Sequence, residues 1–156
     1  MGKILKMVMM FVSAMVFFTG YALAAGADAV TYEKDVKKII SAQCLSCHGS
    51  DAPTMTDFKK EEEKFKKAMK GPRADTYANL MVIVNGSDTG ALMRRLDDGK
   101  NTEKGKAGNM YSYLGGTDEE KAKNLEVIKK WIGGWTLKRE KDISEDELKA
   151  IKALEK

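Results

Sequence analysis

The sequence predicts an all-α fold, and three observations support that prediction. Apolar side chains recur at intervals of three and four residues in several segments, which is the spacing of one face of a helix. Capping residues precede these segments, and Gly-Pro, Asn-Gly or Gly-Gly pairs follow them. No segment shows the strict alternation of apolar and polar residues that marks a half-buried strand, and the sequence contains no internal repeat.

The first residues are expected to precede the fold. A short basic start leads into the apolar run 7–18 and then into Ala22-Leu23-Ala24, the small-x-small pattern at which signal peptidase cuts. We therefore expect residues 1–24 to be a signal peptide that is removed, and the protein to be exported to the periplasm. The alternative is an uncleaved membrane anchor, because the uncharged stretch 7–27 has 21 residues and could span a bilayer.

The first helix is expected to begin at a cap, Thr31, and to run to about Ala42. Its apolar face is made of Tyr32, Val36, Ile39 and Ile40. The proline-containing segment 51–56 is expected to be a loop. A charged helix is expected over 58–70, where glutamates and lysines stand four residues apart and Gly71-Pro72 follows.

The run 77–84 fits two structures. Its consecutive apolar residues could form a buried strand, but they also fit one helical face, made of Tyr77, Leu80, Met81 and Val84. The helix is favoured. A short helix with Leu92 and Leu96 facing inward is expected next, followed by the glycine-containing loop 97–109.

Two capping boxes predict the last helices. Thr117 with Glu120 opens the strongest helix of the chain, whose inner face is Leu125, Ile128, Trp131 and Ile132. Ser144 with Glu147 opens a final helix, whose inward side chains are expected to be Leu148, Ile151 and Leu154. We expect one domain over 25–136 and a helical extension over 137–156 that docks on it.

The motif Cys44-Leu45-Ser46-Cys47-His48 carries the chemistry. At this spacing two thiols add to the two vinyl groups of a haem, and the adjacent imidazole reaches the iron. These residues are the only cysteines and the only histidine of the chain. We therefore expect Cys44 and Cys47 to attach one haem c covalently, with His48 as the proximal iron ligand.

The alternatives for this motif are weaker. A CxxC redox site lacks the surrounding strand and helix alternation, and a zinc site would find only three nitrogen and sulfur ligands where a structural site needs four. The single histidine also excludes a second haem, ligation by two histidines and a catalytic triad that uses histidine.

On the distal face, the iron could be bound by methionine, lysine or water, or the position could be vacant. Met110 follows the glycine-containing loop and precedes the last core helix, so a loop can carry its thioether across the haem face. We expect Met110 to be the distal ligand, and Met81 and Met93 to fill gaps in the core. The other methionines that follow the signal peptide are Met55 and Met69. Ligation by Met93 or Met81, or by no methionine, remains open.

The balance of basic and acidic residues limits which partners can be expected. Without the signal peptide the chain carries 25 basic and 23 acidic residues, and two haem propionates would bring the total near zero. Nothing in this balance indicates nucleic acid. We expect a monomer whose partners are redox proteins, with membrane attachment only if the signal segment is uncleaved. Arg94 and Arg95 are candidates to pair with a propionate, and the candidates to line the haem are Tyr111, Tyr113, Trp131 and Trp135.

The chain resembles class I c-type cytochromes, and in particular mono-haem periplasmic cytochromes of anaerobic bacteria. Residues 31–48 are similar to the first helix and attachment motif of that family, and 110–131 to its methionine loop and last helix. The charged helix near 58–70 and the extension 137–156 depart from the family pattern. The resemblance implies a class I cytochrome c fold, in which the last helix crosses the first.

The leading function is one-electron transfer by a haem with His/Met ligation, without enzymatic activity. One alternative is a haem-based ligand sensor or small peroxidase with an open distal site. The other is a haem subunit docked in a membrane respiratory complex.

Overall fold

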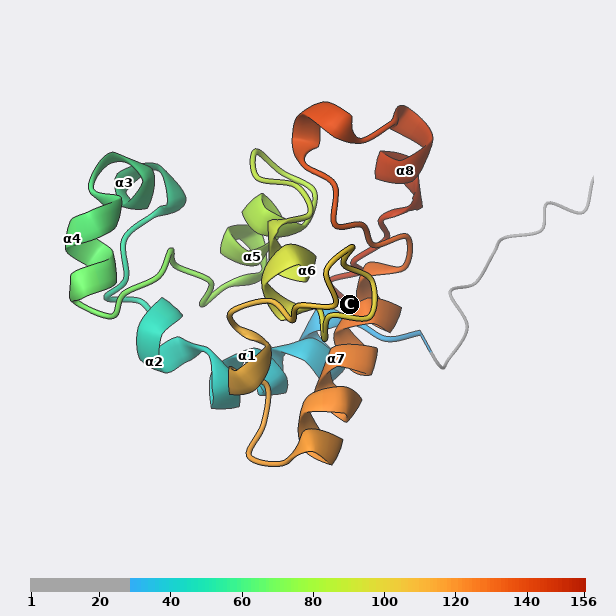
Figure 1. The fold of residues 1–156 in the computed structure, drawn as a ribbon, viewed down its shortest axis with the longest axis horizontal. Helices are drawn as coiled ribbons and strands as arrows, with labels where there is room; N and C mark the ends of the chain where they lie inside the picture. The colour runs from blue at the N-terminus through green and yellow to red at the C-terminus, as the bar shows by residue number, and fades with distance from the viewer. Residues whose placement is uncertain (1–28) are drawn as a thin grey trace, which may run out of the picture.

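The structure is a computed structural model that describes residues 29–156, so the expected signal peptide lies outside the described residues. Within that range the chain is helical and forms no strand, apart from one isolated antiparallel bridge between Gly133 and Ile151. Figure 1 shows helices joined by long loops, and the all-α prediction is confirmed. No helix among the described residues is both long and apolar enough to cross a membrane.

The helical elements follow one another closely between residues 32 and 67 and are spaced more widely after that (Figure 1). In chain order they are η1 (Tyr32–Val36), α1 (Lys37–Gln43), α2 (Leu45–His48), α3 (Met55–Lys60), α4 (Glu62–Lys67), α5 (Tyr77–Val84), α6 (Ala91–Leu96), η2 (Tyr111–Tyr113), α7 (Asp118–Ile132), η3 (Glu140–Asp142) and α8 (Glu145–Ala150).

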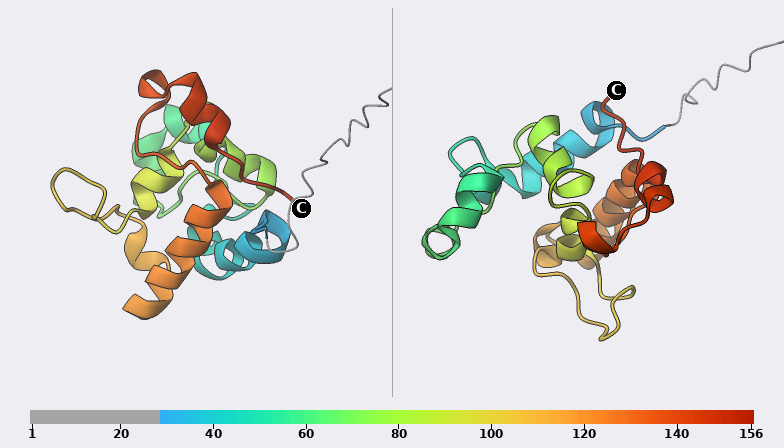
Figure 2. Two further views of the ribbon diagram at one scale, coloured as in Figure 1. Left: turned by 90° about the vertical axis from the view of Figure 1, so that its right-hand side faces the viewer. Right: turned by 90° about the horizontal axis from the view of Figure 1, so that it is seen from above.

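The core lies where α7 packs against η1. Thr31 caps η1, because its hydroxyl accepts a hydrogen bond from the Lys34 amide at 3.3 Å. The rings of Tyr32 and Trp131 meet with their centroids 6.2 Å apart. Every predicted face residue of the first helical segment, η1 with α1, and of α7 is buried: Tyr32, Val36, Ile39, Ile40, Leu125, Ile128, Trp131 and Ile132. Figure 2 shows η1 beside α7, and the two elements are in contact.

The segment 77–84 is a helix, α5, as favoured. Thr76 caps it by accepting from the Asn79 amide at 3.2 Å, which supplies the start signal that a strand would not need. Leu80 and Val84 are buried, and α5 packs against α6.

The charged segment is two short helices, so the single helix expected over 58–70 is wrong. The chain leaves the helical conformation at Glu61 and folds back, and α3 packs against α4. Phe58 and Phe65 would lie about 10 Å apart along one straight helix. The break brings their ring centroids to 6.3 Å. These helices form a lobe, here called the α3–α4 lobe, that stands apart from the other helices (Figure 1).

One of the two capping boxes forms as predicted. Ser144 and Glu147 exchange both hydrogen bonds at the start of α8. At the start of α7, Thr117 accepts from the Glu120 amide at 3.2 Å, but the Glu120 carboxylate accepts from the Gly116 amide at 2.8 Å instead of from the cap itself. The cap of α7 is therefore only half of the predicted box.

The residues after Ala150 are not helical, which corrects the expected inner face of the final helix. Helix α8 ends at Ala150, Leu148 is 42% exposed and Leu154 is 36% exposed, while Ile151 is buried. From there the chain runs along α7: the amides of Lys152 and Ala153 donate to the carbonyls of Ile132 and Trp131 at 2.8 and 3.0 Å. The extension therefore docks on the body, as expected, through main-chain bonds rather than a helical face.

Candidate functional site

The attachment motif occupies one helical turn. Cys44 ends α1, and α2 carries the rest of the motif, with the amides of Cys47 and His48 donating to the Cys44 carbonyl at 3.2 and 3.0 Å. Both cysteines are half-buried, and no disulfide joins them. Burial raises the pKa of Cys44 to about 11. A reactive CxxC pair needs a lowered thiol pKa, so this environment argues against a thiol redox site.

The imidazole of His48 is oriented by a carbonyl. Its Nδ1 lies 2.6 Å from the carbonyl oxygen of Pro72, so an Nδ1–H donates there and the lone pair of Nε2 is left for a metal. Gly71 lies directly against the ring, because a Cβ built on it would stand 2.6 Å from Nδ1 and 2.7 Å from Nε2. A side chain at this position would force the ring or the backbone of residue 71 to shift.

Residues 71–74, here called the proximal strap, are bonded to the motif at two further points. The Gly71 amide donates to the Cys47 carbonyl at 3.0 Å, and the Ala74 amide donates to the His48 carbonyl at 2.9 Å. Sequence reasoning treated Gly71-Pro72 only as a helix stop, and the pairing with residues far back in the chain gave no local signal. The strap fixes both the backbone and the ring of the predicted proximal ligand.

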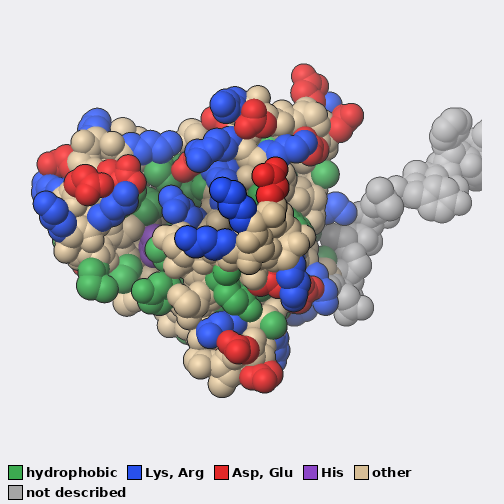
Figure 3. All heavy atoms as spheres, viewed as in Figure 1, with side chains coloured by type: hydrophobic (Ala, Val, Ile, Leu, Met, Phe, Trp, Pro, Cys, Tyr) green, Lys and Arg blue, Asp and Glu red, His purple; other side chains and the backbone are tan. Residues whose placement is uncertain are grey.

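The donor set has an apolar setting suited to a haem. Figure 3 shows hydrophobic side chains gathered around a hollow between the α3–α4 lobe and the rest of the molecule, and Figure 1 places α2 at the lower end of this region. Several half-buried apolar side chains edge the core: Cys44, Leu45, Met81, Met110 and Tyr111. Among residues 29–156, no three His, Cys, Asp or Glu side chains converge as a metal site would require. Two thiols, one oriented imidazole and apolar walls fit a haem c better than a zinc ion.

The five methionines fall into different environments. Met93 is 2% exposed within the core, and Met69 is 72% exposed. Met55 and Met81 are half-buried on helices, whereas Met110 is half-buried on the loop directly before η2. Met93 is a core residue, as expected, and Met110 combines partial burial with a loop position.

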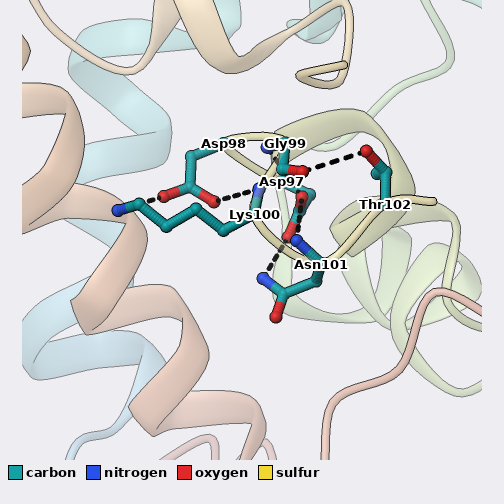
Figure 4. Close-up of polar contacts among 6 residues, drawn as sticks. All are labelled: Asp97, Asp98, Gly99, Lys100, Asn101 and Thr102. Carbon is teal, nitrogen blue, oxygen red and sulfur yellow. Dashed lines mark hydrogen bonds and ion pairs between the residues drawn. The ribbon is translucent and has the colours of Figure 1, made fainter. Parts of the chain in front are cut away.

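The loop that leads to Met110 is closed at its base. The Met110 amide donates to the Arg95 carbonyl at 2.9 Å, and the Gly108 amide donates to the Asp97 carbonyl at 2.8 Å. A Cβ on Gly108 would overlap the backbone of Arg95, so glycine allows this close approach. The side chain of Asp97 is fully buried and accepts hydrogen bonds from the first turn of the loop (Figure 4). Sequence reasoning missed Asp97.

The two candidate arginines have different roles. Arg94 donates to the carbonyls of Thr89 and Lys138 at 3.0 and 2.6 Å, so it ties α6 to the carboxy-terminal segment. Arg95 is exposed and donates only to the Asn109 side chain at 3.1 Å, which leaves donors for a propionate. Arg73 of the proximal strap was not foreseen: its Nε is buried without a hydrogen bond among the described residues, and the nearest acidic oxygen, on Asp75, is 3.8 Å away.

The four candidate aromatic residues also differ in burial. Trp131 is 1% exposed, and its Nε1 donates to the Leu154 carbonyl at 2.8 Å, so it belongs to the core. Tyr113 is 61% exposed. Tyr111 and Trp135 are half-buried beside the core and remain candidates to line a cofactor.

Comparisons with known proteins found one family model and one solved structure that this chain resembles. A family model described as PccH cytochrome c matches residues 31–154. The solved structure of the monoheme cytochrome PccH from Geobacter sulfurreducens has 50% sequence identity and a TM-score of 0.75, over 80% of this chain and 98% of that chain. A search of curated proteins gives no match. The range matched by the family model includes most of the segment 137–156.

Proposed function

This chain belongs to the PccH cytochrome c family and binds one haem c covalently, and we propose that it is a periplasmic one-electron carrier with His48 and Met110 as axial iron ligands. The haem supplies the redox chemistry, because its iron exchanges one electron between the ferric and ferrous states. The protein's own part is to hold the iron ligands in place. The periplasmic location rests on the signal-peptide pattern of residues 1–24.

The observation that carries the proposal is the 2.6 Å contact between His48 Nδ1 and the Pro72 carbonyl. A metal-binding imidazole is ordinarily held by a hydrogen bond from its other nitrogen, which fixes the ring and raises its basicity. Here the acceptor is main chain, and the strap that bears it is itself bonded to Cys47 and His48. We assign the thioether bonds to Cys44 and Cys47 on their spacing before this oriented ring.

Met110 is the distal ligand in this proposal. Together, a thioether from Met110 and an imidazole from His48 would keep the iron six-coordinate in both redox states and would raise the reduction potential relative to two imidazoles. The closed base of the loop supports the assignment, since Met110 is bonded through its own amide to α6. A ligand on so short a tether to a packed helix moves little when the charge on the iron changes.

We propose that the partners are redox proteins and that the carrier works as a monomer. The α3–α4 lobe presents mixed charge, because several of its lysines pair with nearby carboxylates, such as Lys64 with Glu61 at 2.9 Å and Lys66 with Glu62 at 2.8 Å. Nothing on this lobe resembles the unpaired basic face that binds nucleic acid.

Absorption spectroscopy of the purified holoprotein tests the proposal. The ferric protein should show the weak long-wavelength band of sulfur-to-iron charge transfer, and the ferrous protein should bind carbon monoxide poorly because the sixth site is filled. Met110→Ala should abolish the band and open the site. Met81→Leu is the matched control, a nearly volume-conserving change at another half-buried methionine, and should leave both properties unchanged.

The opposite results have distinct meanings. A band that survives Met110→Ala and disappears in Met81→Leu would transfer the ligand role to Met81. A wild type that lacks the band and binds carbon monoxide readily would contradict the carrier and favour a ligand sensor or small peroxidase.

A further inference from the structure

Asp97 is a carboxylate with no exposure to solvent. It stands directly after α6, its amide donates to the Met93 carbonyl at 2.8 Å, and its side chain is 0% exposed. None of the ion pairs within residues 29–156 involves it, whereas its neighbour Asp98 pairs with Lys100 at 2.8 Å. Burying a charged carboxylate is unfavourable unless hydrogen bonds replace its water. The contacts of Asp97 must therefore provide that replacement.

Three N–H groups of the following turn point at this carboxylate. Oδ1 accepts from the Gly99 amide at 2.8 Å and from the Asn101 amide at 3.4 Å, and Oδ2 accepts from the Asn101 side-chain amide at 2.8 Å. Figure 4 shows these groups converging on Asp97. All three partners are donors, and only an ionised carboxylate offers acceptors alone on both of its oxygens.

The same residue closes the far end of the loop through its main chain. The Asp97 carbonyl accepts from the Gly108 amide. Two residues earlier, the Arg95 carbonyl accepts from the amide of Met110, two residues after Gly108. Thr102 supports the middle of the loop, since its hydroxyl lies 3.0 Å from the Gly99 carbonyl and 3.1 Å from the Lys106 carbonyl. Side chain and main chain of Asp97 thus order both ends of the segment that delivers Met110.

We propose that Asp97 is the positioning residue for the distal iron ligand: its buried carboxylate organises the loop 97–109 so that Met110 stays on the iron. This inference rests on the proposed ligation by Met110. It assigns Asp97 no contact with the haem. Without the carboxylate the loop gains conformations in which Met110 is displaced, so the bond between sulfur and iron opens more often.

The test compares Asp97→Asn with Asp98→Asn, which makes the same change at the next residue of the same loop. For each holoprotein, the ferric charge-transfer band is followed during a titration to alkaline pH, where a distal methionine is displaced. An amide at position 97 turns one acceptor into a donor that faces other donors. Losing such a buried bond should ease displacement by about tenfold, which lowers the midpoint by about one pH unit. Asp98→Asn should leave the midpoint near that of wild type.

Far-ultraviolet circular dichroism, recorded at each point of the same pH titration, separates positioning from general damage. The proposal expects the Asp97→Asn protein to be folded throughout the pH range in which its band is lost. Loss of the band only together with the helical signal would contradict it. Should Asp97→Asn fail to accumulate, Asn101→Ala is the second variant. It removes the side-chain amide that donates to Asp97 Oδ2 and should shift the midpoint in the same direction. An unchanged midpoint in that variant would also contradict the proposal.

Failure of the inference is distinguishable from failure of the proposed function. If wild type shows the band, and Asp97→Asn and Asn101→Ala titrate as Asp98→Asn does, Met110 is the ligand but Asp97 does not position it. If wild type shows no band at any pH, the ligation itself is wrong, and the inference falls with it.

Discussion

His48 is fixed by a residue 24 positions later in the chain, which is why its environment could not be read locally. The spacing of Cys44, Cys47 and His48 predicts the chemistry without any structure, because thioether attachment needs those residue types in that order. What the spacing does not reveal is how the ring is held. That information lies in Gly71 and Pro72, which look like an ordinary helix stop in the sequence.

Replacing Gly71 with alanine should damage the proximal side specifically. The added Cβ would overlap the imidazole of His48, so the ring or the strap must shift, and overpacking of this kind costs about 1–3 kcal/mol. Gly116→Ala is the control, since its nearest contact would be 3.7 Å away. Yield of haem-bearing protein and urea unfolding check the prediction. Equal yields and equal stabilities of the two variants would show that the strap tolerates a side chain.

Asp97 illustrates another limit at the level of single residues. The sequence Asp97-Asp98-Gly99 is a recognisable turn signal, and a loop was predicted there. Nothing local distinguishes the fully buried Asp97 from the neighbour that pairs with Lys100. Burial is decided by the packing of α6 and the return of the chain at Gly108, and periodicity carries no information about either.

Helices were predicted well where one apolar face meets the core. The faces of η1, α1 and α7 could be read directly from the spacing of their apolar residues, and α5 from the helical face within its apolar run. The prediction failed at Glu61, because the pairing of Phe58 with Phe65 favours two short helices over one long helix. It failed again after Ala150, where hydrogen bonds to α7 replace the last helical turn.

The end of α4 offers a second test. Met69 has φ of 56°, in the left-handed region, and its amide and that of Lys70 donate to the carbonyls of Lys66 and Phe65, which is the helix-ending pattern that usually contains glycine. Because Met69 is 72% exposed, Met69→Gly loses little packing. It should stabilise the protein by about 0.5–1 kcal/mol in urea unfolding.

Lys67→Gly is the control for that substitution, since position 67 is still helical and glycine there should destabilise by about 1 kcal/mol. If both glycine variants lose stability equally, strain at Met69 does not contribute to the free energy of unfolding.

The last residues of the chain connect three of the elements that enclose the core. The carbonyl of Leu154 accepts from the Tyr32 amide and from Trp131 Nε1, both at 2.8 Å, and the Ala153 carbonyl accepts from the Tyr77 hydroxyl at 2.9 Å. These bonds join η1, α7 and α5, elements that enclose the core. The segment expected from the sequence to be an appended helix therefore links the first helix to the last one.

Deletion of residues 151–156 should lower stability by about 3–5 kcal/mol. The buried Ile151 and Ala153 would be lost, and the Tyr32 amide and the Trp131 indole would be left without partners, at about 1–3 kcal/mol for each unsatisfied donor. Urea unfolding measures the change in the free energy of unfolding, with the same dependence on urea concentration used for each protein. Deletion of Lys156 alone is the control. The haem spectrum of the folded fraction should be unchanged. Equal stability of the two deletions would show that the segment only covers the surface.

Nuclear magnetic resonance of the ferrous holoprotein, labelled with ¹³C at the methionine methyl groups, tests the proposed ligation most directly. Five methionines follow the signal peptide, so five methyl resonances are expected. A methyl on a sulfur that binds the iron lies over the haem ring, and the ring current shifts it far upfield. We predict one such resonance, lost in Met110→Ala and kept in Met81→Leu. Five methyl resonances in the ordinary range would contradict His/Met ligation and the electron carrier built on it.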